Sequence, residues 1–266
     1  MACCANATER LNVHLTAIDN MNADFNEQGF VALPGFLNGQ ELAKVRANLD
    51  RFIREVVPGM PKEHVFYEDK DDPTSLKQLQ KLADNDPFFR ELMFGGRFEQ
   101  LARDLLQDEV VGVNLQYFCK PPGIGKPTPP HQDGYYFMLD PCEAITMWLA
   151  LDHVDEENGC VRYLPGSHRH GMREHNRTST LGFSQGIADY GRDGEAEDEV
   201  AIHAAPGDLL AHHALTIHRA DGSHSPTRPR PALGLVYYAA RAKEDKAAKA
   251  AYQQKLETDL AAQGKI

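Results

Sequence analysis

The spacing of apolar residues along the chain changes after the first 108 residues. Before that point, apolar positions recur every three to four residues, which is the period of helices that bury one face. Asn38 is a favourable N-cap for one such helix, and two more are predicted over residues 75–83 and 87–106. Residues 29–34 read as a short strand between them and the N-terminus. The first part of the chain is therefore expected to be mainly helical.

From Val110 onward the pattern becomes strand-like, with apolar and β-branched runs separated by clusters of Gly, Pro, Asn and Asp. This alternation of short strands and turns is typical of a sandwich or barrel. The predicted strands cover residues 110–118, 145–151, 160–164, 199–203, 209–211 and 233–239.

A helical pattern returns over residues 241–263. Its apolar stripe is expected to pack on the domain's own sheet, or alternatively to form the surface of a homodimer; the stripe consists of Ala248, Tyr252, Leu256 and Leu260. No linker-like stretch interrupts the chain. We therefore expect a flexible N-terminus over 1–19 and a single domain over 20–266, with a β core at about 110–240 buttressed by the N-terminal helices.

The composition is that of an ordinary globular protein, with 42% hydrophobic and 25% charged residues. A net charge of −11 argues against a nucleic-acid or anionic-membrane partner, because binding phosphates requires clustered Lys and Arg. No apolar run approaches the ~20 residues needed to cross a bilayer. Five cysteines without a pairing pattern, and no secretion signal, favour a cytoplasmic location.

The sequence His131-Gln132-Asp133, with a second histidine far downstream, is the strongest chemical signal in the chain. Alternate residues of an extended strand point the same way, so His131 and Asp133 can share one face. Two imidazoles and one carboxylate bind a divalent metal on one side and leave its other positions open. This arrangement suits iron(II), which must also bind a cosubstrate and dioxygen. The residues alone leave four candidates for the second histidine: His212, His213, His218 and His224.

Further segments accompany this motif: HQDGYYF, a single tryptophan at 148, a stretch over 152–168 containing NGC and LPGSH, the turn Pro206-Gly207-Asp208, and Arg230. In this combination, over about 25–240, the chain resembles the phytanoyl-CoA dioxygenase family. The resemblance implies an iron(II)/2-oxoglutarate oxygenase that is mainly β with flanking helices, on a double-stranded β-helix (jelly roll, cupin-like) core. It also implies that the catalytic iron ligands are His131, Asp133 and His218, because His212 and His213 lie too early in the family pattern.

The resemblance also implies which residues bind 2-oxoglutarate. An arginine fork matches a carboxylate bidentately; Arg230 precedes a predicted strand as the family's arginine does, with Arg228 as the alternative. Trp148 falls where the family's tryptophan lines the cosubstrate pocket, which is compatible with core packing. Gln116 and Lys77 match positions that contact the cosubstrate. For Lys77 the alternative is a solvated lysine on a helix.

The implied cofactors are Fe(II), 2-oxoglutarate and O2, and the implied reaction is hydroxylation of an unactivated C–H bond of a small-molecule substrate with release of succinate and CO2. Asp133 favours hydroxylation over halogenation, because halogenases of this class replace that carboxylate with a small residue. Desaturation, cyclisation and epimerisation use the same ligands. A zinc or manganese cupin-like enzyme and a binding module without turnover are rival classes. The substrate is expected to be a small polar or amphiphilic metabolite.

Two other features bear on the substrate cavity. If strand alternation continues past the motif, Tyr135 and Phe137 line the cavity; core packing is the alternative. The segment 170–199 is long, Gly-rich and charged, which is typical either of a lid or of a solvated loop. As a lid, it would bring substrate-binding arginines to the cavity: Arg173, Arg177 and Arg192.

Overall fold

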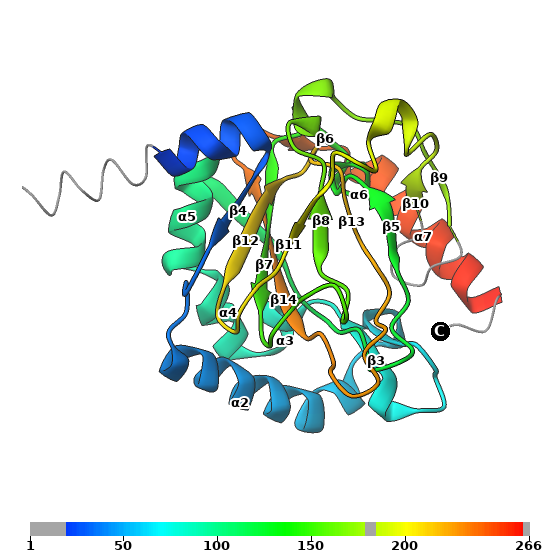
Figure 1. The fold of residues 1–266 in the computed structure, drawn as a ribbon. Coiled ribbons are helices and arrows are strands. Elements are labelled where there is room, and N and C mark those ends of the chain that lie inside the picture. The colour runs from blue at the N-terminus through cyan, green and yellow to red at the C-terminus, as the bar shows by residue number, and fades with distance from the viewer. Residues whose placement is uncertain (1–19, 179–184, 263–266) are drawn as a thin grey trace, which may run out of the picture.

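The computed structural model describes residues 20–178 and 185–262, so the expectation for 1–19 lies outside the described residues. Two antiparallel sheets form the centre of the described fold (Figure 1). The larger has the order β1 (Phe30–Leu33), β12 (Leu209–His213), β7 (Ala144–Ala150), β14 (Ala232–Ala239), β4 (Val110–Phe118), β3 (Leu76–Leu79) and β2 (Val65–Tyr67). The smaller has the order β11 (Val200–Ile202), β8 (Val161–Tyr163), β13 (His218–Ala220) and β5 (Thr128–His131).

Helices from the first part of the chain cover the larger sheet. The first runs over 20–28 and is followed by α2 (Gly39–Glu55), α3 (Leu82–Asn85), α4 (Pro87–Met93) and α5 (Arg97–Leu106). Asn38 and Glu41 form a reciprocal capping box at the start of α2, as the sequence predicted for Asn38. Phe52, Phe89 and Phe98 from three of these helices are buried in one core with strand residues of the larger sheet. Burying each such side chain contributes about 1.5–3 kcal/mol, which holds the helical layer on the sheet.

Short elements complete the fold. Within the described residues, five 3₁₀ segments are Val57–Gly59, Lys62–His64, Pro73–Ser75, Ser167–His170 and Arg192–Gly194. A short helix, α6 (Gly134–Phe137), follows β5. Two small sheets pair β9 (His175–Arg177) with β10 (Gln185–Ile187), and β6 (Leu139–Asp140) with β15 (Lys243–Glu244).

The six strands predicted beyond residue 110 and the strand over 29–34 are all confirmed, within one or two residues at most ends. The helix predicted over 75–83 is wrong: its first half is β3, whose residues are all buried and which pairs with β2 on one side and β4 on the other. Tertiary pairing overrides a helical pattern there. The helix predicted over 87–106 is two helices, because Gly95, with a φ of +73°, interrupts it.

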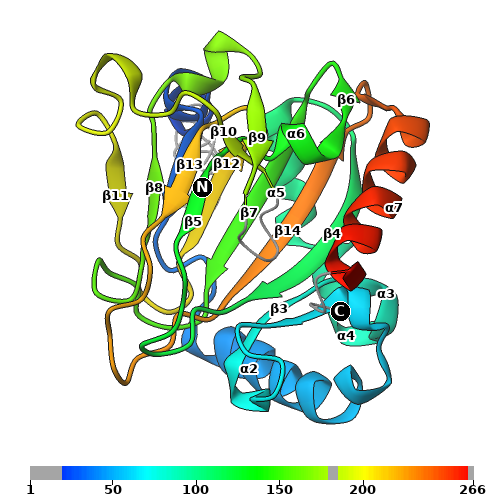
Figure 2. The same ribbon diagram turned by 90° about the vertical axis from the view of Figure 1, so that its right-hand side faces the viewer.

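The predicted C-terminal helix is confirmed as α7 (Lys246–Ala262), which starts a few residues later than expected. Figure 1 shows α7 on the opposite side of the strands from α5, and Figure 2 shows it alongside β4, with β6 near its upper end. Tyr252 and Leu256 of its apolar stripe line the cavity described below, whereas the side chain of Leu260 lies outside the described residues. A homodimer through α7 stays a prediction. Among the described helices, none has the length and apolarity to cross a membrane.

Candidate metal centre and cosubstrate pocket

The smaller sheet brings His131, Asp133 and His218 together. His131 is the last residue of β5 and His218 the first of β13, and the two are direct partners in the antiparallel register. The strand ends at His131, however, and Asp133 has helical backbone angles at the start of α6. The expected strand alternation is therefore wrong, although its consequence holds: one donor atom from each residue lies within 4.8 Å of the others. This is the one such group found among the described residues.

The two imidazoles of this group are oriented by their own backbone. His131 Nδ1 lies 2.8 Å from the carbonyl of Pro129, and His218 Nδ1 lies 3.0 Å from that of Thr216. A carbonyl only accepts, so Nδ1 carries the proton in each ring and Nε2 keeps its lone pair. The Nε2 atoms of His131 and His218 lie 3.4 and 3.8 Å from Asp133 Oδ1. Three electron-pair donors therefore converge on one point.

Charge and burial prepare this group for a cation. Burial, followed by the neighbouring rings of His131 and His212, holds the pKa of His218 well below its usual value, so the ring is neutral near pH 7. Burial alone would raise the pKa of Asp133. The three neighbouring imidazoles, His218 first and then His131 and His212, outweigh it and hold the pKa of Asp133 well below its usual value. A neutral imidazole and an ionised carboxylate are the forms that bind metals.

The second oxygen of Asp133 is held by the larger sheet. Thr146 Oγ1 donates to Asp133 Oδ2 over 2.5 Å, and His212 Nε2 lies 3.2 Å from the same oxygen. His212, one of the four candidate histidines, thus touches the carboxylate of the group without belonging to it. The other two lie elsewhere: His213 Nε2 is 3.5 Å from Glu143, and His224 is exposed.

A cavity of about 940 Å³ opens from this group. All four residues expected to bind the cosubstrate line it: Lys77, Gln116, Trp148 and Arg230. Arg230 is 5% exposed, and its guanidinium lies 5.1 Å from the centre of the Trp148 ring. Arg228, the alternative to Arg230, does not line the cavity and forms ion pairs with Asp155 and Glu157 at 2.9 and 2.6 Å.

Sequence reasoning missed Lys120 and Glu68, which lie at the same end of the cavity. Lys77 is a buried residue of β3 whose Nζ lies 2.9 Å from Glu68, so the alternative of a solvated helix lysine is wrong. Burial, followed by the charges of Arg230 and Lys77, holds the pKa of Lys120 well below its usual value. The position of Lys120 two residues after β4, before Pro121, was the available signal. A buried cluster of three cations and one carboxylate results.

We call the buried side that joins the metal group to this cluster the inner wall: His131, Asp133, Thr146, Trp148, His212, His218 and Arg230. We call the opposite side the outer wall: Arg177, Thr178, Lys246, Lys249, Tyr252 and Leu256. Tyr136 and Phe137 of α6 lie between the two, and Tyr136 is 6.4 Å from Tyr252, ring centre to ring centre.

Of the two aromatic residues expected to face the cavity, Phe137 does and Tyr135 does not line it. Tyr135 instead stacks on His175, with ring centres 4.4 Å apart. The helical turn of α6 explains the difference, because residues of a helix do not alternate between two faces. The same turn brings Tyr136, which was not expected, to the cavity.

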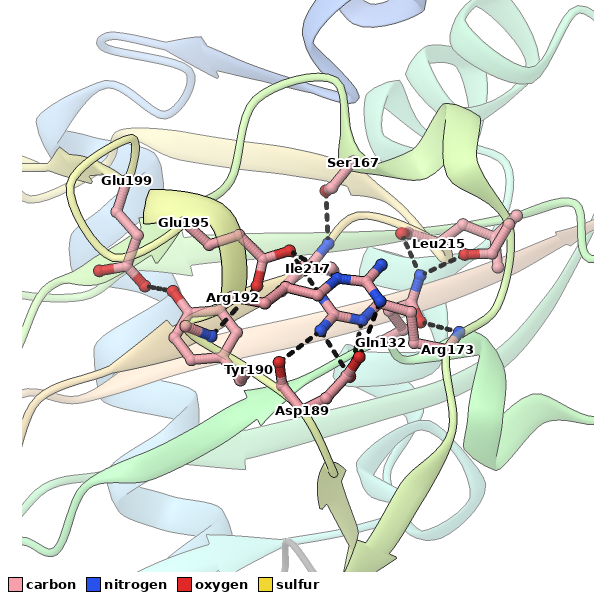
Figure 3. A network of polar contacts seen from close by, with 12 residues as sticks. Gln132, Ser167, Arg173, Asp189, Tyr190, Arg192, Glu195, Glu199, Leu215 and Ile217 are labelled. Carbon is pink, nitrogen blue, oxygen red and sulfur yellow. Dashed lines mark hydrogen bonds and ion pairs between the residues drawn. The ribbon is translucent and has the colours of Figure 1, made fainter.

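Residues 179–184 of the segment 170–199 lie outside the described residues. The part of the segment that is described is anchored to the metal motif through Gln132 (Figure 3). The buried amide of Gln132 donates to the carbonyls of Gly171 and Leu215 and accepts from the backbone of Arg173. Arg173 binds Asp189 and Glu195, each at 2.5 Å, and Arg192 binds Asp189 at 2.8 Å. Two of the three arginines expected to bind substrate thus serve the segment itself.

The third of these arginines, Arg177, does line the cavity. It is the last residue of β9, and its side chain is exposed. Substrate binding by an arginine of this segment therefore stays a prediction for Arg177.

The chain is similar to enzymes that use iron and 2-oxoglutarate. It is 27% identical over 229 residues to the phytanoyl-CoA dioxygenase of Arabidopsis thaliana, covering 73% of this chain and 80% of that protein. It superposes on EvdO2 from Micromonospora carbonacea var. aurantiaca complexed with 2-oxoglutarate, with a TM-score of 0.66, 27% identity, and coverage of 85% and 92%. The epimerase SnoN in complex with Fe3+, alpha-ketoglutarate and nogalamycin RO gives a TM-score of 0.68, 25% identity and 86% coverage of each chain.

With the His131–Asp133–His218 group set in an antiparallel β fold, these similarities define the protein as an Fe(II)/2-oxoglutarate-dependent dioxygenase. The model of the phytanoyl-CoA dioxygenase (PhyH) family matches residues 25–232. The chain belongs to that family.

Proposed function

We propose that the enzyme hydroxylates an unactivated C–H bond of a small molecule while 2-oxoglutarate is converted to succinate and CO2, with His131, Asp133 and His218 as its iron ligands. The observation that carries this proposal is the convergence of two Nε2 lone pairs and one carboxylate oxygen within 4.8 Å. Such a facial set leaves coordination positions open for a bidentate cosubstrate and dioxygen. Iron, when bound there, supplies the redox chemistry, and the protein supplies binding, orientation and exclusion of water.

Arg230 is proposed to bind the distal carboxylate of 2-oxoglutarate. Burial lowers the pKa of Arg230 to about 10, which still leaves the guanidinium charged near pH 7. Its Nε has no hydrogen-bond partner among the described residues, and no ion pair to it occurs there. A buried cation without an anion is costly. A dicarboxylate removes that cost, and the Trp148 ring beside the guanidinium fixes its orientation.

Lys120 is proposed to add a second positive charge to this end of the pocket. Lys77 is already neutralised by Glu68 at 2.9 Å, so we assign it to holding Glu68 beside β3 as well as contacting the cosubstrate. Gln116 accepts a hydrogen bond from Gln78 over 3.1 Å, which fixes the Gln116 amide toward the cavity. Together these side chains make one end of the cavity a site for an anion.

The substrate is proposed to lie between the outer wall and α6, where aromatic rings and cations both line the cavity. Tyr136, Phe137 and Tyr252 offer apolar faces, and Arg177 and Lys246 offer charges at an exposed rim. This combination suits a small polar or amphiphilic molecule.

The two sheets are consistent with the jelly-roll core. The main hydrophobic core joins residues from helices and strands, which supports a single domain over 20–266.

Epimerisation is a second candidate outcome, because SnoN, which is 25% identical to this chain, is an epimerase. Hydroxylation adds one oxygen atom to the product, whereas epimerisation leaves its mass unchanged. A panel of metabolites, scored by mass spectrometry and by succinate released above the substrate-free background, separates the two. Succinate release without any iron dependence would contradict both.

Ligand assignment is tested without a substrate. Under anaerobic conditions iron(II) and 2-oxoglutarate together should give a weak visible charge-transfer band. His131→Ala and Asp133→Ala should each abolish the band, and His213→Ala, on the other face of β12, should retain it. A band that persists in both ligand variants would show that the iron lies elsewhere.

A further inference from the structure

His212 stands out among the residues of the inner wall, because it is a third imidazole beside three side chains that already make a complete facial set. It is 3% exposed, and its ring centre lies 4.3 Å from that of His218. Its Nε2 nevertheless faces Asp133 Oδ2, the carboxylate oxygen that points away from His131 and His218. His212 is therefore placed to act on the carboxylate.

The proton positions around His212 follow from its partners. A carboxylate only accepts hydrogen bonds, so His212 Nε2 carries the proton and donates to Asp133 over 3.2 Å. In the neutral ring Nδ1 then accepts, and the hydroxyl of Tyr163 lies 3.0 Å from it. Tyr163 has no exposed surface and pairs directly with His218 in the smaller sheet. Hydrogen bonds therefore connect Tyr163 through His212 to Asp133, and we call this chain of hydrogen bonds the relay.

Both hydrogen bonds to Asp133 Oδ2 come from one pair of residues that lie opposite each other on adjacent strands of the larger sheet. Thr146 of β7 and His212 of β12 are direct partners in the antiparallel register, and each reaches the same oxygen. Two donors saturate the outward lone pairs of Oδ2 and prevent the carboxylate from rotating. Oδ1 alone then remains to bind a metal.

We propose that His212, oriented by Tyr163, is a positioning residue that keeps Asp133 a ligand through one oxygen only. The inference rests on the proposed function, in which Asp133 binds iron. A carboxylate that bound through both oxygens would occupy a coordination position that the cosubstrate or dioxygen requires. Groups that hold metal ligands in this way typically contribute about 10–100-fold to metal affinity or activity.

The test measures anaerobic iron(II) affinity by competition with a chromophoric chelator, together with the charge-transfer band formed with 2-oxoglutarate. His212→Phe, which keeps the bulk and removes the donor, should weaken iron(II) binding by about 10–100-fold and shift the band. His212→Gln, whose amide nitrogen can reach the place of Nε2, should restore both to within about threefold of the wild type. His213→Phe, a buried imidazole on the opposite face of the same strand, is the matched control and should behave as the wild type.

Three outcomes overturn the inference or its basis separately. A wild-type affinity and band in His212→Phe would refute the role of His212 while leaving the iron site intact. Equal losses in His212→Phe and His212→Gln would show that the hydrogen bond to Asp133 is not what His212 contributes. A wild-type protein without any band would instead contradict the proposed function.

Should His212→Phe not fold, Tyr163→Phe is the second variant, because it removes only the hydroxyl. It should shift the band in the same direction by a smaller amount. An unchanged band in Tyr163→Phe would refute the relay.

Discussion

The inner and outer walls of the cavity differ in how their side chains are held. Every inner-wall residue lies on a strand of the two sheets, or next to one, and most make hydrogen bonds or ring contacts that fix their orientation. On the outer wall, Arg177, Lys246 and the surrounding part of α7 are exposed. Lys249 is partly exposed and bonds to Tyr238 over 3.1 Å.

The difference indicates how chemistry and specificity are divided in this fold. A metal site tolerates small positional errors poorly, so it belongs where neighbouring strands fix each side chain. Substrate recognition can vary on elements that cross the cavity mouth without belonging to the sheets. We therefore expect changes in the inner wall to affect both the substrate-free decarboxylation of 2-oxoglutarate and the turnover that depends on the substrate. Changes in the outer wall should affect only turnover that depends on the substrate.

The largest expected effect comes from removing the carboxylate of the metal group. Asp133→Ala should reduce 2-oxoglutarate decarboxylation by more than the roughly 100-fold that indirect support of a ligand contributes, because iron(II) loses a direct bond. Succinate release and bound iron are measured together. Asp189→Ala, which removes a carboxylate from the 170–199 segment, is the control. Equal losses in the two variants would contradict the division of the cavity.

The next effect concerns the anchor of the cosubstrate. Arg230→Met should raise the KM for 2-oxoglutarate by roughly 10–150-fold, because a hydrogen bond to a charged group contributes about 1.5–3 kcal/mol. Arg228→Met, which breaks only exposed ion pairs, should change the KM by less than about twofold. The measurement is the initial rate of succinate formation against cosubstrate concentration. A larger effect at Arg228 would reverse the assignment.

A smaller and more selective effect is expected on the outer wall. Tyr252→Ala should leave substrate-free decarboxylation within about twofold of the wild type, as for substitutions outside the packed core. It should lower succinate release with any substrate that the metabolite panel identifies, because the Tyr252 ring faces the cavity beside Tyr136. Gln254→Ala, an exposed position on the same helix, is the control. A matching loss of both activities would show that α7 supports the metal site.

The smallest effect is a proton taken up when 2-oxoglutarate binds. Burial lowers the pKa of Lys120, and an arriving dianion favours its charged form and raises that pKa. Below the lowered pKa the amine is already protonated, so uptake should be small there and should grow as the pH rises above that pKa. Calorimetry of 2-oxoglutarate binding in two buffers with different ionisation enthalpies, at neutral and mildly alkaline pH, measures it. Lys120→Met should abolish the increase.

The sequence by itself determined the strands beyond residue 110, the capped helix α2 and the residue types of the metal motif, because periodicity, capping and a short motif are local properties. It did not determine that residues 76–79 form a strand, since only pairing with β2 and β4 decides that. Nor could it show that Asp133 leaves the strand for a helical turn, or that Lys120 joins Arg230. The role of His212 depends on Thr146 and Tyr163, which lie on separate strands of two sheets. Which side chains meet across the cavity is a property of strand register, and only the tertiary structure fixes that register.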